Sequence, residues 1–437
     1  MNFIQRAGLL YVFALFFAGL GVIVGKYEVF PYSILKDIQN FLAGDPTEDT
    51  DFFDKIKNDL GIHPERFLHS VSPAPDREFV ELKLDGLKSR RELPRLFLTS
   101  GQPAGYRVIF GAFDFEEHLW GGILLDHRGD VVHRWQLTTE DLPTNETPDN
   151  LKNLYGVAIL PDGSVIFSMQ EKSGGIVKVD VCSRPVWALE GQYHHTVSLT
   201  DENAFWTFGG SQEALDHKLH LVDVESGSIL KTIDMKDVRF RNPDIHIFDL
   251  QVERGVADAV HGNDIEALSA DMASAFPGFE HGDLLLSYRT INLVFVLDPE
   301  SLKVKWWRVG AWDRQHDPDW NPDGTISVFS NNERGVGKYS NIVSIDPGSF
   351  AFKTLLDGSK YDFRSTFNGA QQITDHGSIL VSSGLQGRLF EVDRNGDVIF
   401  DFINSYSWQQ QQALRVAETR YLESDFFSFQ GFPKCEN

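Results

Sequence analysis

Basic residues are scarce in this chain. The 40 Lys and Arg residues face 63 Asp and Glu, which gives a formal net charge of −23 over 437 residues. This excess of negative charge opposes extended contact with nucleic acid or with an anionic lipid surface. The chain is not of the disordered type, because 42% of its residues are hydrophobic and only 24% are charged. An anionic substrate could still reach a local cluster of cations, since charge is screened over about 8–10 Å.

Long apolar runs are also rare, and one stands out at the amino terminus. Residues 7–25 are nineteen consecutive uncharged residues, which as a helix would measure about 28 Å and span a membrane. The run is either a signal peptide or a membrane anchor. Arg6 precedes it, Lys26 follows it, and no Ala-x-Ala cleavage signature ends it. We therefore favour an uncleaved transmembrane anchor, with the rest of the chain outside the cytoplasm, in the periplasm if the cell is Gram-negative.

Cysteine is limited to Cys182 and Cys435, so the chain can form at most one internal disulfide. In an exported chain this pair permits a bond that fastens the carboxyl-terminal tail to the second of the repeats described below. The alternative is two unpaired thiols, and sequence spacing does not decide between them.

A pattern of short strands repeats six times along the chain. Each copy has an apolar run, a second strand that ends in a turn, and a further apolar strand. Strands rich in Val, Ile, Phe and Leu, separated by Asp-Gly-like turns at roughly 40–55 residues per unit, are typical of four-stranded propeller blades. The sequence therefore predicts an all-β fold, a six-bladed β-propeller whose repeats begin near residues 105, 160, 200, 281, 321 and 375.

This prediction divides the chain into four parts. Between anchor and propeller we expect two helices, near residues 32–42 and 52–60, in a segment that either spaces the domain from the membrane or serves docking or dimerisation. After the last repeat, Leu414, Ala417 and Tyr421 would share one face of an amphipathic helix that caps the barrel. The parts are an anchor or signal peptide (1–26), a juxtamembrane segment (27–100), the propeller as the catalytic domain (101–405), and a capping helix with its tail (406–437).

Residues at the same place in successive repeats line the central channel together, because the first strand of each blade runs along it. Four residues stand seven positions before the acidic residue of the next turn: Tyr155, His195, His316 and Asn368. His261 stands at the equivalent entry to the fourth repeat, and Arg289 follows the next strand there. His194 precedes His195, and since adjacent strand residues alternate, only one of the two should face the channel.

Three imidazoles and a guanidinium that converge on one point form a site for an oxyanion. Arg289 can offer a fork of donors to two oxygens of a sulfuryl or phosphoryl group, and the imidazoles of His195 and His261 can serve the others. His316 is the candidate nucleophile, because a neutral imidazole can attack sulfur and form a covalent intermediate. Three histidines also suit zinc. Arg289 in the same cluster would repel a metal ion, so we predict no metal.

Four segments resemble the bacterial arylsulfotransferases, also called aryl-sulfate sulfotransferases. The resemblance covers roughly residues 100–425, and the RYLESDF stretch near its end is similar to the closing helix of the family. The segments are HHTVSL from His194, VHGNDIEAL from Val260, SYRTINLVFVLDP from Ser287 and RQHDPDWNPDG from Arg314.

The resemblance implies a six-bladed propeller that transfers a sulfuryl group from a phenolic sulfate ester to a phenolic or other hydroxyl acceptor, without a nucleotide sulfate donor or another cofactor. It implies that His316 is the sulfated histidine. His195, His261 and Arg289 would bind sulfate and serve acid–base steps. The remaining candidates for substrate binding are Asn263, which fits the family's His-x-Asn pattern, together with His194, Tyr155 and Asn368.

The amino-terminal region departs from the family, because an anchor and helices stand in place of an accessory β domain. The dimer arrangement of the best-known members therefore does not carry over, and a homo-oligomer stays open. Two other functions are compatible with such a pocket. One is a non-catalytic propeller that binds anions or scaffolds envelope proteins, and the other is a sulfatase that admits water to the covalent intermediate.

Overall fold

The computed structural model describes the propeller region and little of what precedes it. The described residues are 68–70, 77–89, 91–139, 153–170, 175–210, 218–249, 260–332, 339–366, 368–409 and 411–435. They belong to one unit, Phe67–Asn437. The predicted anchor and the two predicted amino-terminal helices lie outside the described residues. Among the described residues, no helix combines the length and apolarity needed to cross a membrane.

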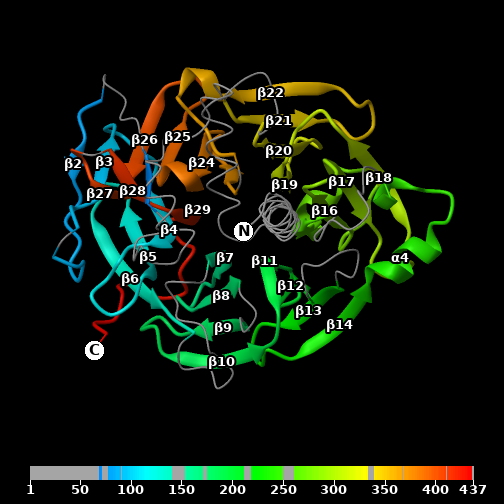
Figure 1. Cartoon of the computed structure of the whole chain (residues 1–437), viewed down its shortest axis with the longest axis horizontal. Helices are drawn as coiled ribbons and strands as arrows, with labels where there is room; N and C mark the ends of the chain where they lie inside the picture. Colours follow the sequence, from blue (N-terminus) through cyan, green and yellow to red (C-terminus); the bar gives the residue numbers. More distant parts are fainter. Residues whose placement is uncertain are drawn as a thin grey trace, which may run out of the picture. The chain divides into compact units, whose positions relative to one another are not determined.

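Six antiparallel sheets stand around a central axis like the blades of a propeller (Figure 1). This confirms the predicted six-bladed β-propeller. Blades 2 to 5 each use four consecutive strands in the order inner to outer. They are β7 (Asn153–Ile159), β8 (Val165–Gln170), β9 (Gly175–Val179) and β10 (Pro185–Glu190); β11 (Tyr193–Leu199), β12 (Ala204–Gly209), β13 (Lys218–Asp223) and β14 (Ile229–Asp234); β15 (Gly262–Ala267), β16 (Leu284–Tyr288), β17 (Leu293–Leu297) and β18 (Val304–Val309); and β19 (His316–Trp320), β20 (Ile326–Ser330), β21 (Asn341–Ile345) and β22 (Phe352–Asp357).

The sixth and first blades are built from both ends of the propeller sequence. Blade 6 has β23 (Ala370–Ile373), β24 (Ile379–Ser383), β25 (Arg388–Val392) and β26 (Val398–Ile403), with β3 (Arg95–Leu98) and β2 (Val80–Glu81) added at its outer edge. Blade 1 has β29 (Val416–Glu423) innermost, then β4 (Gly105–Ala112), β5 (Trp120–Asp126) and β6 (Val131–Leu137). Residues 77–98 therefore include two strands of the propeller, where we had predicted only a juxtamembrane segment.

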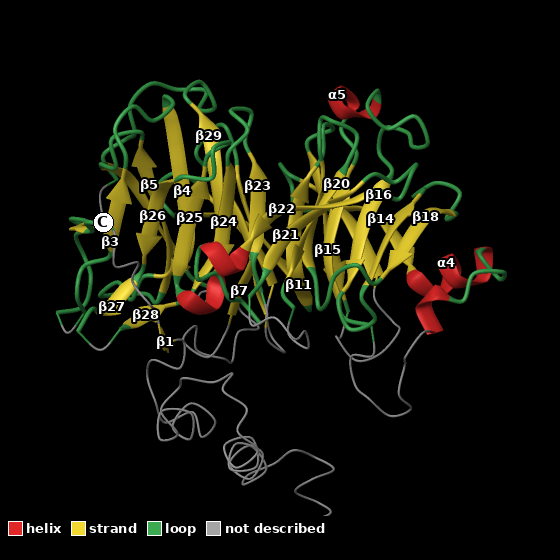
Figure 2. Cartoon of the chain, turned by 90° about the horizontal axis from the view of Figure 1, so that it is seen from above, coloured by secondary structure: helices red, strands yellow, loops and turns green. Residues whose placement is uncertain are grey.

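Short helices and one small sheet complete the described fold. Figure 2 shows α5 at one end of the blades and the small sheet of β27 and β28 at the opposite end. These elements are α4 (Met235–Arg241), α5 (Ala270–Ala273), the 3-10 turns η2 (Ile247–Asp249), η3 (Gly358–Lys360) and η4 (Gly384–Gln386), and the sheet of β1 (Leu68–Ser70), β28 (Gln412–Leu414) and β27 (Ser405–Ser407).

The predicted capping helix at 406–437 is wrong, because this segment forms strands. β29 pairs antiparallel with β4 from Val416 opposite Gly111 to Glu423 opposite Gly105. Without β29 the inner edge of β4 would expose a row of unpaired backbone groups. The need to pair that edge outweighs the helical spacing of Leu414, Ala417 and Tyr421. The innermost strand of blade 1 is therefore β29, and not the first strand of its own repeat.

The core lies between neighbouring blades, because both faces of most middle strands are covered. All residues of β5, β9, β12, β16, β17, β20 and β25 are buried. Phe110, Phe167 and Phe208 are among the fully buried side chains, and each such burial stabilises the fold by about 1.5–3 kcal/mol. The Asp-Gly turn between β7 and β8 shows why these residues suit turns. Gly163 adopts a left-handed backbone with φ +80, and Asp162 accepts a hydrogen bond from the Ser164 N–H.

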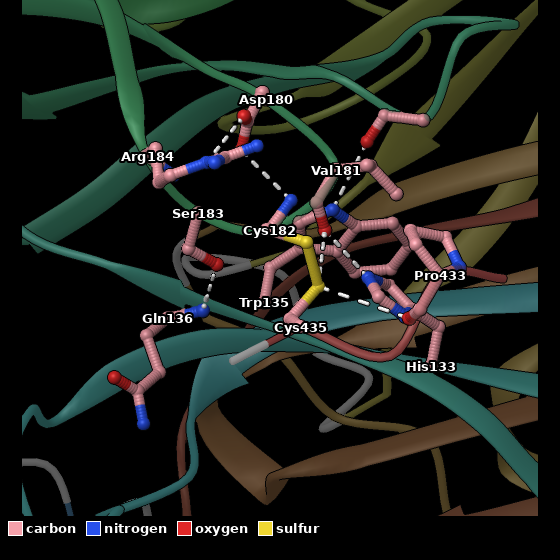
Figure 3. The surroundings of a disulfide bond; sticks show 11 residues. His133, Trp135, Gln136, Asp180, Val181, Cys182, Ser183, Arg184, Pro433 and Cys435 are labelled. Atoms are coloured by element: carbon pink, nitrogen blue, oxygen red, sulfur yellow. Dashed lines mark hydrogen bonds and ion pairs between the residues drawn. A yellow bond between two sulfur atoms is a disulfide. The ribbon is translucent and has the colours of Figure 1, made fainter. Parts of the chain in front are cut away.

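A disulfide joins Cys182 and Cys435, with Cα atoms 5.3 Å apart (Figure 3). Cys182 lies in the turn between β9 and β10, and Cys435 lies in the tail that follows β29. Nearby, the ring of Phe432 stacks on His133 at 4.6 Å, and His133 Nε2 lies 2.7 Å from the Val181 carbonyl oxygen. The bond fastens the tail to blade 2, one of the two outcomes that the sequence left open. It also favours an extracytoplasmic location.

Candidate functional site

The inner strands of several blades carry a bulge at the same place, and these bulges expose the candidate residues. The pairing register shifts between Leu154 and Val157, His194 and Ser198, Gly262 and Asp264, and His316 and Asp319. Residues at or beside three of these places have left-handed backbones: φ is 62 at His195, 49 at His261 and 47 at Asp317. Asn368, before the inner strand of blade 6, has φ 59. Such conformations cost energy in non-glycine residues and concentrate at functional sites. Sequence spacing detected the equivalence of these positions.

Tyr155 takes the corresponding place in blade 2, and the residue after it is a glycine for a steric reason. A Cβ atom on Gly156 would lie 2.2 Å from the carbonyl oxygen of His195. The inner strands of blades 2 and 3 therefore approach each other closely beside the site. This approach brings the ring of Tyr155 to 4.9 Å from the ring of His195.

His316, the first residue of β19, is held as a neutral imidazole. Its Nδ1 lies 2.7 Å from Asn331 Oδ1, and the Asn331 amide group donates to the carbonyls of Ser365 and Asn368. Since both amide hydrogens are thus used, Oδ1 must accept, and the proton sits on His316 Nδ1. The backbone N–H of Asn368 points at His316 Nε2 from 3.2 Å. Nε2 therefore keeps its lone pair.

Burial lowers the pKa of His316 to about 3. The positive charge of Arg289 acts in the same direction, the hydrogen bond that His316 donates to Asn331 opposes it, and the nearness of His261 lowers the pKa further. Because protonation would place a second cation beside Arg289 in a desolvated position, the neutral form of His316 is favoured at neutral pH. A neutral, oriented imidazole is what a nitrogen nucleophile needs.

His194, His195 and His261 form a chain of imidazoles. His194 Nδ1 lies 2.7 Å from His195 Nδ1, and His195 Nε2 lies 3.1 Å from His261 Nε2. His195 lines the main cavity, whereas His194 does not; its ring stacks on Phe208 at 5.4 Å and is 2% exposed. The expectation that only one of the pair faces the channel therefore holds for His195. The chain can pass a proton along hydrogen bonds, because each ring has one donor and one acceptor when neutral.

Arg289 follows β16 and is tied to His261 through the backbone. Its N–H donates to the His261 carbonyl at 2.9 Å. Arg289 and His261 are half-buried and lie outside the lining of the main cavity. Arg289 is nevertheless close enough to His316 to lower its pKa. The structure thus gathers the four predicted residues from blades 3, 4 and 5 around His316.

Gln315 fixes the position of His316 across the boundary between blades 4 and 5. This side chain is fully buried, and its Nε2 lies within 3.2 Å of the Ser287 hydroxyl and of two blade-4 carbonyls. The backbone carbonyl of Gln315 accepts a hydrogen bond from Asn263 Nδ2 at 2.8 Å. Asn263 therefore binds the backbone beside His316, and the amide atom left for the cavity that it lines is its Oδ1.

Arg415 is a site residue that the sequence analysis missed. Its guanidinium carbon lies 5.2 Å from the centre of the Tyr155 ring, and its Nη1 donates to Asn153 Oδ1 at 3.1 Å. Arg415 is 5% exposed and lines the cavity. Arg415 lies between β28 and β29. The sequence predicts a helix for this segment, and a helix outside the blades would not place Arg415 in the channel. Asn331, which orients His316, was missed because it follows a second strand outside the repeat position that we compared.

A cavity of about 620 Å³ begins at His195 and His316 and runs along the inner strands to Met272 of α5. Carboxylates occupy its wall. Desolvation raises the pKa of Asp264 and Asp319 well above the usual range, and nearby Asp317 acts in the same direction. Desolvation also raises the pKa of Glu266 to about 8 and that of Glu418 to about 7. Desolvation therefore favours the neutral form of these carboxyl groups, which line the same cavity as His195 and His316.

No group of three or more His, Cys, Asp or Glu side chains in the described part of the chain is arranged to hold a metal ion. The imidazole nitrogens of His194, His195 and His261 meet one another instead of converging on a common point. The arrangement is suited to binding an oxyanion at Arg289, nucleophilic attack by His316, and proton exchange through His195 and His261.

Comparison with known proteins identifies the family. The arylsulfotransferase (ASST) family model matches residues 156–405. A search of curated protein sequences finds no match. Similar solved structures include a protein of unknown function from Bacteroides caccae (TM-score 0.49, 10% identity, 73% of this chain and 99% of that chain) and TolB from Acinetobacter baumannii (TM-score 0.45, 10% identity, 74% and 68%). These TM-scores are too low to support an argument. The family model covers more than half of the chain, including His195, His261, Arg289 and His316, and the chain belongs to the arylsulfotransferase family.

Proposed function

We propose that the protein transfers a sulfuryl group from a phenolic sulfate ester to a hydroxyl acceptor through a sulfohistidine at His316. The observation that carries this proposal is the state of His316, which is neutral and buried, with Nδ1–H bound to Asn331 and a lone pair on Nε2. Family membership supports the donor class, because arylsulfotransferases act on aryl sulfates. The disulfide supports an extracytoplasmic location, and a membrane anchor at residues 1–26 remains our proposal.

In the first half-reaction His316 Nε2 attacks the sulfur, and the S–O bond to the aryl group breaks as the N–S bond forms. The leaving phenolate takes the electron pair of that bond and a proton from the pair of His195 and His261. Charge on the three sulfuryl oxygens is stabilised by Arg289 and by imidazole N–H donors in a desolvated site. The Asn368 N–H, which now lies 3.2 Å from Nε2, is freed in this step to donate to a sulfuryl oxygen.

In the second half-reaction an acceptor hydroxyl attacks the sulfur of sulfohistidine. The new O–S bond forms, the N–S bond breaks, and its electron pair returns to His316 Nε2. The hydroxyl proton returns to the pair of His195 and His261, so the site is regenerated. Splitting the transfer in this way replaces one difficult step with two easier ones. Water in place of the acceptor would make the same site a sulfatase.

The test is to incubate the full chain with 4-nitrophenyl sulfate, with and without phenol, and to map peptide masses. We expect an adduct of about 80 Da, the mass of one sulfuryl group, on the peptide that contains His316, and its loss when phenol is added. His316→Gln should form no adduct, whereas His376→Gln, at a half-exposed histidine on blade 6, should form it normally. A folded wild-type protein that releases no nitrophenol and gains no mass would favour the anion-binding propeller instead.

A further inference from the structure

The cavity beside His316 has a strong excess of acidic groups. Its described wall contains seven carboxylates and two guanidinium groups, and no lysine. The carboxylates are Asp264, Glu266, Asp317, Asp319, Glu418, Glu423 and Asp425, and the guanidinium groups are Arg415 and Arg420. Arg289, which lies outside this lining, favours an anion at the His316 end, whereas the acidic groups of the wall favour a cation.

The two arginines neutralise only part of this wall. Arg420 Nε lies 3.0 Å from Glu418, and its Nη2 lies 4.0 Å from Asp317. Arg415 is held against Tyr155 and bound to Asn153. The carboxyl group of Asp264 has no hydrogen bond or ion pair to any residue that the structure describes. Burial, and after it Asp317, Glu266 and Glu418, raise its pKa, and Arg420 opposes this shift. Burial and these acidic neighbours favour the neutral form of the Asp264 carboxyl group, and a cation supplied by a ligand would favour its ionised form.

Asn263 supplies a second, independent indication that a ligand binds here. Its side chain is 94% buried, and no described residue donates a hydrogen bond to its Oδ1. A buried acceptor without a partner costs about 1–3 kcal/mol. A sulfuryl group has only acceptor oxygens and cannot satisfy this atom. A ligand with N–H or O–H donors can.

The bulge in β19 places this acidic wall beside the nucleophile. Asp317 has φ 47, and both His316 and Asp317 line the cavity although they are adjacent in the strand. A molecule whose hydroxyl lies at His316 would therefore carry its next groups past Asp317 and Asp264. The volume of about 620 Å³ is typical of sites for small organic ligands.

A bare metal ion does not fit this wall, because no three of the described acidic side chains are arranged to hold one. The carboxylates are instead spread along the cavity. An organic ammonium group carries its donors on a flexible chain and can meet several separated oxygens.

We propose that the preferred acceptor is a cationic hydroxyl compound, such as a phenol with an ammonium side chain. Its ammonium group lies among Asp264, Asp317 and Asp319, and its hydroxyl reaches the sulfur on His316. This inference rests on the proposed sulfuryl transfer, and it specifies the acceptor of that reaction. The bonds made and broken are those of the second half-reaction above.

The first experiment compares three phenols of similar size with the sulfated full chain: tyramine (cationic), 4-ethylphenol (neutral) and 4-hydroxyphenylacetate (anionic). We expect kcat/KM for discharge of the sulfohistidine to be higher for tyramine than for 4-ethylphenol by on the order of tenfold, and lowest for the anion. The preference should shrink as salt is added. Equal rates, or a preference for the neutral or anionic phenol, would overturn the proposal while leaving sulfuryl transfer intact.

The second experiment places the charge preference at the wall. Asp264→Asn should reduce the ratio of tyramine to 4-ethylphenol to a value near one, whereas Asp237→Asn, on the exposed helix α4, removes the same charge and should preserve the ratio. If Asp264→Asn does not fold, the wild-type series still decides. An unchanged ratio in a folded Asp264→Asn variant would also overturn the proposal.

Calorimetry of tyramine binding to the unsulfated full chain separates failure of this proposal from failure of the reaction. If tyramine binds to the wild type and not to Asp264→Asn, while the wild type forms no sulfuryl adduct, the site for a cation is supported and sulfuryl transfer is rejected. An absence of tyramine binding together with indiscriminate discharge would reject the cationic site alone.

Discussion

Asn331 holds His316 in one tautomer: its Oδ1 lies 2.7 Å from His316 Nδ1, while both of its amide hydrogens are bound to the carbonyls of Ser365 and Asn368. The two side chains come from neighbouring strands of blade 5, β19 and the end of β20. The relationship resembles that of a catalytic histidine and the group behind it in a hydrolase triad, where the second residue sets which nitrogen is free.

Replacing Asn331 by Ala should slow adduct formation from 4-nitrophenyl sulfate by roughly 10²-fold or more, since a wrong histidine tautomer costs up to about 10⁴ in a serine protease. The ¹⁵N shifts of His316 should change from those of a fixed Nδ1–H tautomer to an average of two. Asn395→Ala, at an exposed turn of blade 6, is the control. Unaltered shifts and rates in Asn331→Ala would show that the hydrogen bond does not set the tautomer.

The stability of the protein should fall in mild acid partly because of His316. Burial and Arg289 lower its pKa to about 3, so below pH 6.5 the unfolded chain binds a proton that the folded chain refuses. The contribution is complete above pH 6.5 and is lost as the pH falls towards 3, by up to about 1.4 kcal/mol per pH unit. Urea denaturation between pH 7.5 and 4.5 should show a steeper loss for the wild type than for His316→Gln. Parallel curves would contradict the low pKa.

Loss of the disulfide should destabilise the propeller without unfolding it at room temperature. The bond joins residues separated by 253 positions, and native disulfides of this kind contribute about 2–5 kcal/mol. Cys435→Ser should lower the melting temperature by several degrees, measured by thermal denaturation. Reductant should lower the melting temperature of the wild type to that of the variant and leave the melting temperature of the variant unchanged. If reductant does not change the melting temperature of the wild type, the tail contributes little to stability.

A buried ion pair should govern the boundary between blades 1 and 6. Arg107 Nη2 lies 2.6 Å from Glu391 Oε2, with both side chains 2% exposed or less, and the guanidinium lies 4.7 Å from the centre of the Phe400 ring. Glu391→Ala leaves Arg107 buried without its partner and should cost about 3–5 kcal/mol in urea denaturation. The double variant Arg107→Met with Glu391→Met should recover much of that loss. A loss in the double variant equal to the single one would mean that packing, and not the unpaired charge, sets the cost.

The blade count and the positions facing the channel could be predicted from the sequence because propeller repeats keep a fixed phase. The interval of seven residues from His195 and His316 to the next turn reflects bulges and turns that recur in several blades. His261 lies before its strand, where we expected the entry to the fourth repeat, and Arg289 lies after the next strand of that repeat. Sequence reasoning could therefore find the residues whose position depends only on their place within a repeat.

Contacts between distant segments could not be predicted in this way. Residues 416–423 have a spacing compatible with an amphipathic helix, and only the open edge of β4 makes them a strand. Arg415 was lost with that error. The acidic wall was also missed, because Asp264, Asp317 and Glu418 belong to three different blades and meet only across the channel.

The pairing of β29 with β4 sets the order of events during biosynthesis. β4 ends at Ala112 and β29 begins at Val416, so about 300 residues must be synthesised before the two can meet, which takes roughly 15–60 seconds at common ribosomal rates. Throughout that time the nascent first blade has an open edge on which another chain could pair. A polypeptide that terminates before β29 cannot close the ring of blades. The propeller domain can therefore be completed only when translation is almost finished.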